Sequence, residues 1–235
     1  MRIERPFLSV VLPFRDQADH VEKVLRMYVE TLGSLGRTYE LVAVPNACAD
    51  GTPAIVSRLS RQDTRIVAVE NLRGGWGLSV RAGLAAARGQ VLCYTNSART
   101  DPVQVVSLLE LYLRSGTHLA KVRRARRAAP VRTLGSWLYN LEGRLLLGIR
   151  AGDANGTPKM FSRELYEKLQ LTSDGDLLDM ELLAKAARLG EEVVEMPVAG
   201  FSRHGGKSST NVASAFRMLS GVWKLRRQIS RFIPV

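Results

Sequence analysis

The sequence predicts an α/β fold in which helices cover a mostly parallel sheet. Through the first half of the chain, short apolar runs typical of buried strands alternate with longer segments typical of helices. Glycine or proline stands at several of the boundaries between them. This alternation implies parallel strands joined by crossover helices, and 235 residues with 46% hydrophobic side chains favour one folded domain.

The first strand is expected at residues 8–12 and is ended by Pro13. Asp16 then has the side chain to cap a helix that runs to about residue 35. A turn leading into a short strand is expected at residues 153–161. The same reasoning places further strands at residues 39–44, 65–69, 91–94, 118–122 and 193–198, and helices at 52–59, 79–87, 102–114, 134–147 and 179–189.

The chain is strongly basic, with 34 Lys and Arg residues against 22 Asp and Glu residues and a formal charge of +12. This excess favours an anionic partner, which is a membrane surface, a nucleic acid or a phosphorylated ligand. The alternative is a solvated basic face without a role. Nucleic acid is the weakest of the three partners because the chain has no recognition motif and no aromatic residues interleaved with its Arg run.

Cysteine and histidine usage excludes two classes of site. Cys48 and Cys93 are too few for a disulfide framework, and the three histidines lack zinc-site spacing. A reducing cytoplasm is therefore the expected compartment. The apolar run near the N-terminus is too short for a membrane span and lacks a cleavage site, so we expect a strand there rather than a signal peptide.

Residues 70–102 form the stretch around which a site is expected. A Gly-rich turn that includes Gly75, a helix and a short apolar strand follow one another, and residues 95–97 come directly after the strand. Ligands of open α/β sheets bind at the carboxyl ends of strands, so these polar, uncharged residues are candidate ligand contacts. Trp76 in the turn is expected either to stack on a base or sugar or to pack against the sheet.

Several segments follow one another in a recognisable order. They are SVVLPFRDQADHVEKVL, VPNACADGT, NLRGGWGLSVRAGLAAARG, YTNSARTDP, a basic helix with Arg132, Ser136 and Asn140, DANGTPKMF, DLLDMELLAKAARLG and EMPVAGFSRHGGKSS. Over residues 7–209 the chain thereby resembles the family 2 glycosyltransferases of the GT-A fold, in particular the dolichyl- and polyprenyl-phosphate mannose and glucose synthases. The resemblance implies a GT-A (Rossmann-like) sheet and an inverting transfer of a sugar from a nucleotide-sugar donor to a polyprenyl phosphate or another small acceptor.

The chain departs from the family pattern at both of its acidic motifs. Pro45 and Asn46 stand where the family has two adjacent carboxylates, and residues 95–97 stand where it has Asp-X-Asp. Asp50 is the acidic residue that remains in the first of these loops. Mg²⁺ and Mn²⁺ prefer carboxylate oxygens, so either ion is compatible with the family but no cofactor is assigned to this chain.

The ends of the first, second and fourth strands carry the candidates for donor binding. Asn46 offers a donor and an acceptor to a nucleobase edge, whereas Asp50 either contacts the nucleotide or caps a helix. Arg99 is hypothesised to replace a metal ion beside the leaving diphosphate, the alternative being a surface loop charge. The expected donor-side contacts are Pro13, Arg15, Asp16, Asn46, Asp50, Gly75, Arg81, Thr95, Asn96 and Ser97, with Arg99 in a catalytic role.

The resemblance implies that Arg132, Arg203 and Lys207 are catalytic residues that lie, with Ser208, near the acceptor phosphate. An ionised lipid phosphate needs cations to hold it rather than a strong base, and guanidinium groups can form two parallel hydrogen bonds to its oxygens. The alternative for residues 201–209 is a mobile basic loop.

Three carboxylates of the second half are further candidates, as acceptor-side groups for a hydroxyl nucleophile or a ligand. These are Asp153, Asp179 and Glu181. Glu181 alternatively pairs with Lys185 one helical turn away. Asp153 alternatively shapes a turn, or orients Lys159.

Residues 210–232 are expected to form a basic amphipathic helix suited to an anionic membrane interface, the alternative being a helix that packs on the domain's own core. The expected domains are therefore a transferase domain at 1–209 and a helix at 210–235 that belongs to it or anchors it at the inner face of the membrane. The competing function is a non-catalytic GT-A-like protein that binds nucleotide or lipid. The apolar stripe consists of Val212, Phe216, Leu219, Val222, Trp223, Leu225, Ile229 and Phe232, and the basic residues are Arg217, Lys224, Arg226, Arg227 and Arg231.

Overall fold

A computed structural model of the chain describes residues 5–124, 130–199 and 212–233, without the side chains of 130–134 and 212–219. Its strands are β1 (Leu8–Phe14), β2 (Tyr39–Pro45), β3 (Ile66–Ala68), β4 (Val91–Tyr94), β5 (Leu119–Arg124), β6 (Lys159–Ser162) and β7 (Val193–Val198). Within the described residues these seven form one sheet in the order β3-β2-β1-β4-β6-β5-β7. β6 runs antiparallel to β4 and β5, and the other paired strands are parallel, which confirms the expected mostly parallel sheet.

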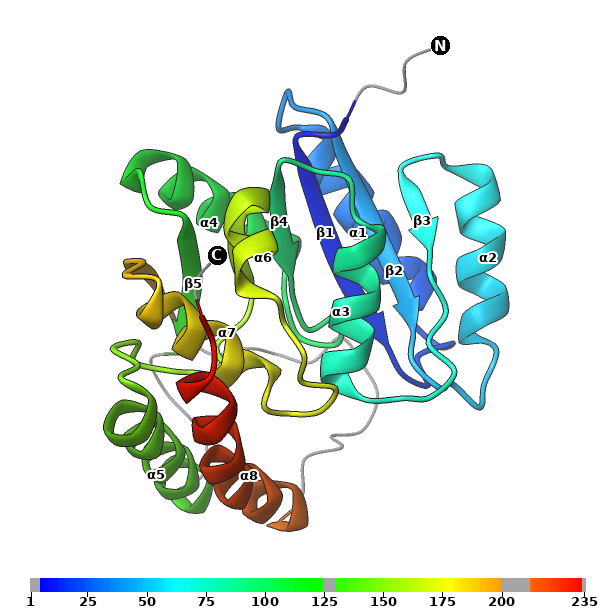
Figure 1. Ribbon diagram of the computed structural model, residues 1–235. Coiled ribbons are helices and arrows are strands. Elements are labelled where there is room, and N and C mark those ends of the chain that lie inside the picture. Colours follow the sequence, from blue (N-terminus) through cyan, green and yellow to red (C-terminus); the bar gives the residue numbers. More distant parts are fainter. Residues whose placement is uncertain (1–4, 125–129, 200–211, 234–235) are drawn as a thin grey trace.

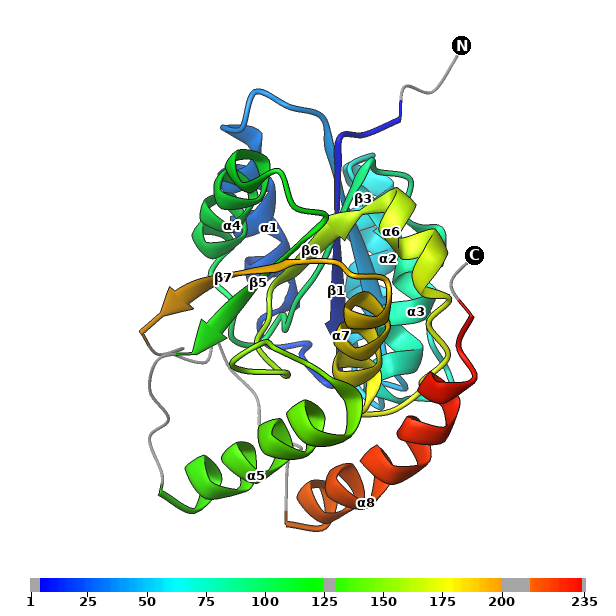
Figure 2. The same cartoon turned by 60° about the vertical axis from the view of Figure 1, so that its left-hand side comes forward.

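Helices cover both faces of the sheet (Figure 1 and Figure 2). They are α1 (Val21–Gly33), α2 (Thr52–Gln62), α3 (Trp76–Ala86), α4 (Pro102–Ser115), α5 (Pro130–Leu147), α6 (Arg163–Leu169), α7 (Leu178–Arg188) and α8 (Val212–Ser230). Successive residues of a strand point to opposite faces. In β1, Val10 therefore packs in one apolar cluster with α1, α2 and α4, whereas Val11 packs in a second cluster with α3, α7 and α8.

The start of the chain differs from expectation in two ways. β1 continues through Pro13 to Phe14 instead of ending before Pro13, because its pairing with β4 stops at Val11 and the proline lies beyond that neighbour. Asp16 does not cap α1, which begins five residues later. It adopts a positive φ of 48°, and its carboxylate accepts a hydrogen bond from the Ala49 N–H at 2.8 Å, so that it joins the loops after β1 and β2.

α8 packs against α5 and α7. Val222, Leu225 and Ile229 are buried in the same apolar cluster as α3 and α7, and Gly221 lies so close to Leu177 that a Cβ there would overlap the leucine side chain. The buried side of α8 therefore packs on the domain's own core, as one of the two alternatives supposed, and binding of the tail to a membrane interface stays a prediction. No helix in the described ranges combines the length and apolar character that a bilayer span requires.

Candidate functional site

One edge of the sheet collects the polar groups of the candidate site. The carboxyl ends of β4 and β5 lie there, and the amino end of β6 joins them because β6 runs the opposite way. In this register Lys159 pairs with Tyr94 on one side and with Lys121 on the other. The edge is the one at which ligands of open α/β sheets bind.

Asp179 is the point at which three donors of this edge converge. Its carboxylate accepts hydrogen bonds from the Tyr94 hydroxyl at 2.7 Å, the Lys159 ammonium at 2.5 Å and the Trp76 indole N–H at 3.2 Å. Asp179 stands in the first turn of α7, where the helix dipole favours negative charge. Trp76 also packs edge-to-face on Tyr94, so the alternative of packing against the sheet holds for this indole.

Burial determines the protonation behaviour of the donors. The Lys159 side chain is fully buried, and burial lowers its pKa to about 8 although the neighbouring Asp179 carboxylate acts in the opposite direction. Burial, together with Asp179, raises the pKa of Tyr94 well above its usual value, so the phenol keeps its proton and donates. The cluster therefore holds one anion, a lysine that titrates near the physiological range and a neutral phenol.

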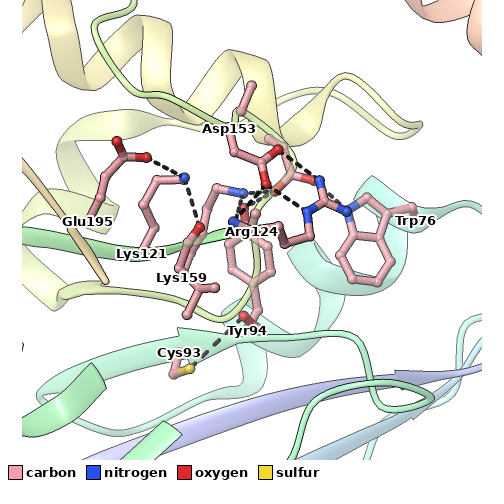
Figure 3. A network of polar contacts seen from close by, with 12 residues as sticks. Trp76, Cys93, Tyr94, Lys121, Arg124, Asp153, Lys159 and Glu195 are labelled. Carbon is pink, nitrogen blue, oxygen red and sulfur yellow. Dashed lines mark hydrogen bonds and ion pairs between the residues drawn. The ribbon is translucent and has the colours of Figure 1, made fainter. Parts of the chain in front are cut away.

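A second group of charges lies beside this cluster (Figure 3). The Arg124 guanidinium forms two hydrogen bonds with the Asp153 carboxylate, at 2.6 and 2.8 Å. Lys121 donates to Glu195 at 2.8 Å, and burial lowers the Lys121 pKa against the effect of that carboxylate. The backbone carbonyl of Asp153 accepts from the Gly156 N–H, so Asp153 shapes the expected turn, and its side chain pairs with Arg124 rather than hydrogen-bonding Lys159.

The segment that replaces Asp-X-Asp is closed by its own hydrogen bonds. The Thr95 and Thr100 hydroxyls lie 2.6 Å apart, and the buried Ser97 hydroxyl donates to the Pro13 carbonyl at 2.6 Å. The Asn96 side-chain oxygen accepts from the Ala98 N–H at 3.1 Å. Hydroxyl and amide oxygens that are already engaged are poor ligands for a hard divalent cation, so these residues do not fit Mg²⁺ or Mn²⁺.

A second group brings metal-type donors together on the loops after β1 and β2. Ligand atoms of Asp16, Cys48 and Asp50 all lie within 4.8 Å of one another. The Asp50 carboxylate, however, accepts from the Ala18 N–H at 2.8 Å and from the Thr52 N–H at 3.0 Å, which is the helix-capping alternative. With Asp16 also occupied and a soft sulfur as third donor, this group does not fit an oxygen-preferring cation either.

Asn46 lies at the carboxyl end of β2 and is buried. Its side-chain oxygen accepts from the Asn71 amide at 3.1 Å, and the same amide group donates to the Ser79 hydroxyl at 2.9 Å. The acceptor of Asn46 is therefore engaged, and the amide N–H₂ is the group that remains for a ligand. Arg15, on the loop after β1, is exposed.

The Gly-rich turn approaches the loop before α7 rather than an open crevice. Gly75 has a φ of 115°, and a Cβ there would lie 2.6 Å from the Asp174 carbonyl oxygen. The Leu78 N–H donates to the same oxygen at 2.8 Å. Arg81 donates to the Thr172 carbonyl at 2.9 Å and pairs with the Asp174 carboxylate. These contacts link α3 to the loop at residues 172–175, and the expected diphosphate contact of Arg81 stays a prediction.

Glu181 also belongs to this link. It pairs with Lys185 at 2.6 Å, as the alternative for this residue supposed. Its two oxygens further accept from the Thr172 N–H, the Thr172 hydroxyl and the Ser173 N–H at 2.7 to 3.1 Å. Because the chain itself occupies both oxygens, the expected acceptor contact of Glu181 has no support in this geometry.

The expected cationic residues are only partly described. Arg99 is half-buried in the turn after β4, where its N–H donates to the Asn96 carbonyl at 3.1 Å. Arg132 lies in α5, but its side chain is outside the described residues. Arg203, Lys207 and Ser208 also lie outside them.

Sequence reasoning missed Tyr94, Lys121, Arg124 and Glu195 as members of the polar edge. One signal was present, since a lysine inside a short apolar strand is rarely buried without a partner. Lys121 in β5 and Lys159 in β6 both stand in such strands. Their partners could not be named from the sequence because Glu195 and Asp179 are separated from them by 74 and 20 residues.

Comparisons with known proteins give one consistent result. A model of the family described as Glycosyl transferase family 2 matches residues 9–170. The chain is 31% identical over 207 residues to "Glycosyltransferase AglD" of Haloferax volcanii, a match that covers 81% of this chain and 32% of the relative. It is 23% identical over 221 residues to "Undecaprenyl-phosphate 4-deoxy-4-formamido-L-arabinose transferase" of Pseudomonas paraeruginosa, covering 93% and 63%. The chain thus spans less than two thirds of the length of these relatives.

Solved structures share the fold. Glucosyl-3-phosphoglycerate synthase from Mycobacterium tuberculosis, in complex with Mn²⁺, uridine diphosphate and glucosyl-3-phosphoglycerate, superposes with a TM-score of 0.69 at 21% identity. The match covers 98% of this chain and 81% of that structure. The GT-A-like architecture that the sequence led us to expect is therefore confirmed.

Proposed function

Because the chain belongs to glycosyl transferase family 2, we propose that it transfers a sugar from a nucleotide-sugar donor to a polyprenyl phosphate at the cytoplasmic face of a membrane. A phosphate oxygen of the acceptor attacks the anomeric carbon and the nucleoside diphosphate departs from the opposite side, so the configuration is inverted. The name of one relative includes undecaprenyl phosphate, and that of a structural neighbour includes uridine diphosphate.

The hydrogen bonds that the Asp179 carboxylate accepts are the observation that favours a phosphate acceptor over a hydroxyl acceptor. A hydroxyl acceptor needs a base with a free lone pair within hydrogen-bond reach. Asp179 instead already accepts hydrogen bonds from Tyr94, Trp76 and the Lys159 ammonium, so its oxygens are engaged within the protein and do not offer a free lone pair to a substrate hydroxyl. An acceptor that brings its own negative charge, such as a lipid phosphate, needs no such base.

The donor's diphosphate would be met by fixed cations and amide groups. Neither the segment at residues 95–97 nor the group of Asp16, Cys48 and Asp50 suits a divalent ion, so arginine side chains become the candidates for stabilising the leaving group. Arg99 follows the segment that replaces Asp-X-Asp, and Asn46 with Arg15 lies at the neighbouring strand ends. We assign Arg99 to the leaving diphosphate, and Arg132, Arg203, Lys207 and Ser208 to the acceptor phosphate.

A transfer assay with labelled uridine and guanosine diphosphate sugars and detergent-dispersed polyprenyl phosphate tests this proposal. We expect product in the presence of EDTA, and a loss on the order of a hundredfold or more in Arg99→Ala. Arg114→Ala, which removes an exposed arginine of α4, is the matched control and should remain active. Strict dependence on an added divalent metal would overturn the role of Arg99, and equal transfer to the uncharged polyprenol would overturn the argument about the acceptor.

A non-catalytic protein that binds nucleotide or lipid is the second candidate. The observation in its favour is the closure of Thr95 and Ser97 by hydrogen bonds at the place where the family holds its ion. Titration calorimetry with nucleotide sugars, run beside the transfer assay, separates the two candidates. Binding without turnover of any donor would favour the second candidate, and turnover would exclude it.

A further inference from the structure

The outer sides of α5 and α8 carry large apolar side chains that the fold leaves in water. On α5 these are Trp137, Leu138 and Leu145, which are 57%, 40% and 75% exposed. Their spacing of seven and eight residues places them on one face of the helix. Trp223 of α8 is 56% exposed, although the sequence pattern grouped it with the stripe that turned out to be buried.

The two helices lie side by side at one end of the molecule in both views (Figure 1 and Figure 2), and α8 packs directly against α5. α8 divides sharply into an inner side, on which Val222, Leu225 and Ile229 are buried, and an outer side with Trp223 and Arg227, one turn apart. We call the exposed residues Trp137, Leu138, Leu145, Trp223, Lys224 and Arg227 the α5–α8 platform.

The charge around these side chains is of one sign. α8 contains no acidic residue, and Lys224, Arg226, Arg227 and Arg231 are all exposed. Within the described part of the chain none of these four forms an ion pair, and neither does Arg144 on the outer side of α5. Glu142, the acidic residue of α5, is only half exposed, and burial raises its pKa. A protein partner with an ordinary mixed surface would leave several of these cations unmatched.

Two exposed indoles among unpaired cations fit a layer that is anionic outside and apolar beneath. Tryptophan favours the headgroup region of a bilayer, and lysine or arginine near an anionic leaflet adds about 1 kcal/mol each. We propose that the α5–α8 platform binds the surface of a bilayer containing anionic lipids, with Trp137 and Trp223 inserted at the level of the headgroups.

Sedimentation with vesicles tests the platform without any sugar donor, so its failure would leave the transferase proposal standing. The chain should bind vesicles of phosphatidylglycerol and phosphatidylcholine, and bind pure phosphatidylcholine much more weakly. Lys224→Gln with Arg227→Gln should weaken binding about 25-fold, since 1 kcal/mol is about fivefold per residue. Trp137→Ala with Trp223→Ala should weaken it at least about tenfold.

The matched control is Leu113→Gln with Arg114→Gln on α4, an exposed apolar and basic pair elsewhere on the surface. This variant should bind like the unaltered chain, and circular dichroism should be the same for all variants. Equal losses in the control and in the platform variants would overturn the proposal. A second outcome would also overturn it. In that outcome the unaltered chain does not bind vesicles but self-associates in sedimentation velocity, and the double tryptophan variant no longer self-associates.

Fluorescence adds a readout that does not depend on affinity. Trp137→Phe and Trp223→Phe each leave one platform indole, and the double variant leaves only the half-buried Trp76. Brominated lipids should quench each single variant and leave the double variant unquenched. Quenching that is equal in the double variant would contradict insertion of the platform.

Discussion

Replacing Asp179 by asparagine removes a buried charge and keeps the size of the side chain. Lys159 is fully buried and Asp179 is its only carboxylate partner at hydrogen-bond distance among the described residues, so Asp179→Asn leaves an ammonium in the interior without a counterion. Breaking a buried pair in this way costs about 3–5 kcal/mol of unfolding free energy. Asp174→Asn breaks an exposed pair with Arg81 and should cost under about 1 kcal/mol.

The cost of Asp179→Asn should also depend on pH. The pKa of Lys159 is about 8 in the folded chain, below its ordinary value, so the unfolded chain binds more protons between these values and stability rises with pH there. Without Asp179 the pKa of Lys159 in the folded chain falls further, so the free energy of unfolding begins to rise at a lower pH. The destabilisation should therefore be larger at about pH 6 than at about pH 10, where Lys159 is neutral in both folded proteins.

Equilibrium unfolding in urea measures both quantities. Combining Asp179→Asn with Lys159→Met should recover most of the lost stability, because an uncharged pair leaves no buried ion unmatched. The reasoning would be refuted if Asp179→Asn cost no more than Asp174→Asn, or if its cost were the same at both ends of the pH range.

Two other substitutions have clear expected outcomes in the same unfolding assay. Glu40 is buried and accepts from the backbone and guanidinium of Arg88 as well as from Ser9, so Glu40→Gln should cost about 2 kcal/mol; a change near zero would mean that the pair is not formed in solution. Gly77→Ala should destabilise the protein by about 1–3 kcal/mol, since the added Cβ would overlap the Ser173 carbonyl oxygen. Gly135→Ala meets no neighbour in α5 and should stabilise by up to about 1 kcal/mol, and equal effects of the two glycine changes would contradict the packing described.

The fold was more predictable than the site because the fold depends on local patterns. The apolar run of β4 and the amphipathic spacing of α1 can be recognised within a dozen residues. β4 was expected where it lies, and α1 was expected as a helix although it begins several residues later than its predicted cap. The predicted end of β1 was wrong because a proline is tolerated where a strand has lost one of its two neighbours. Which strands are neighbours depends on the strand order, and local sequence does not give that order.

The contacts of the site depend on that non-local information. Asp16 was expected to cap a helix, but the loop after β2 takes its carboxylate instead. Arg81 and Glu181 were expected to contact ligands, and their hydrogen bonds to the loop at residues 172–175 could not be foreseen from the sequence. The polarity of Thr95 and Ser97 was legible, whereas their engagement by Thr100 and Pro13 appears only once the turn is folded.

The close seating of residues 173–175 on the Gly-rich turn has a consequence for how this sequence can vary. The atoms that face Gly75 and Gly77 are main-chain carbonyl oxygens, and every amino acid has one. A bulkier residue in the turn therefore cannot be rescued by trimming the opposing side chains, because there is nothing there to trim. Only a shift of the whole segment at residues 173–175 would make room for a larger side chain. Because that segment leads directly into α7, such a shift would also displace Asp179. A substitution at Gly75 or Gly77 would therefore disturb a residue about a hundred positions later in the chain.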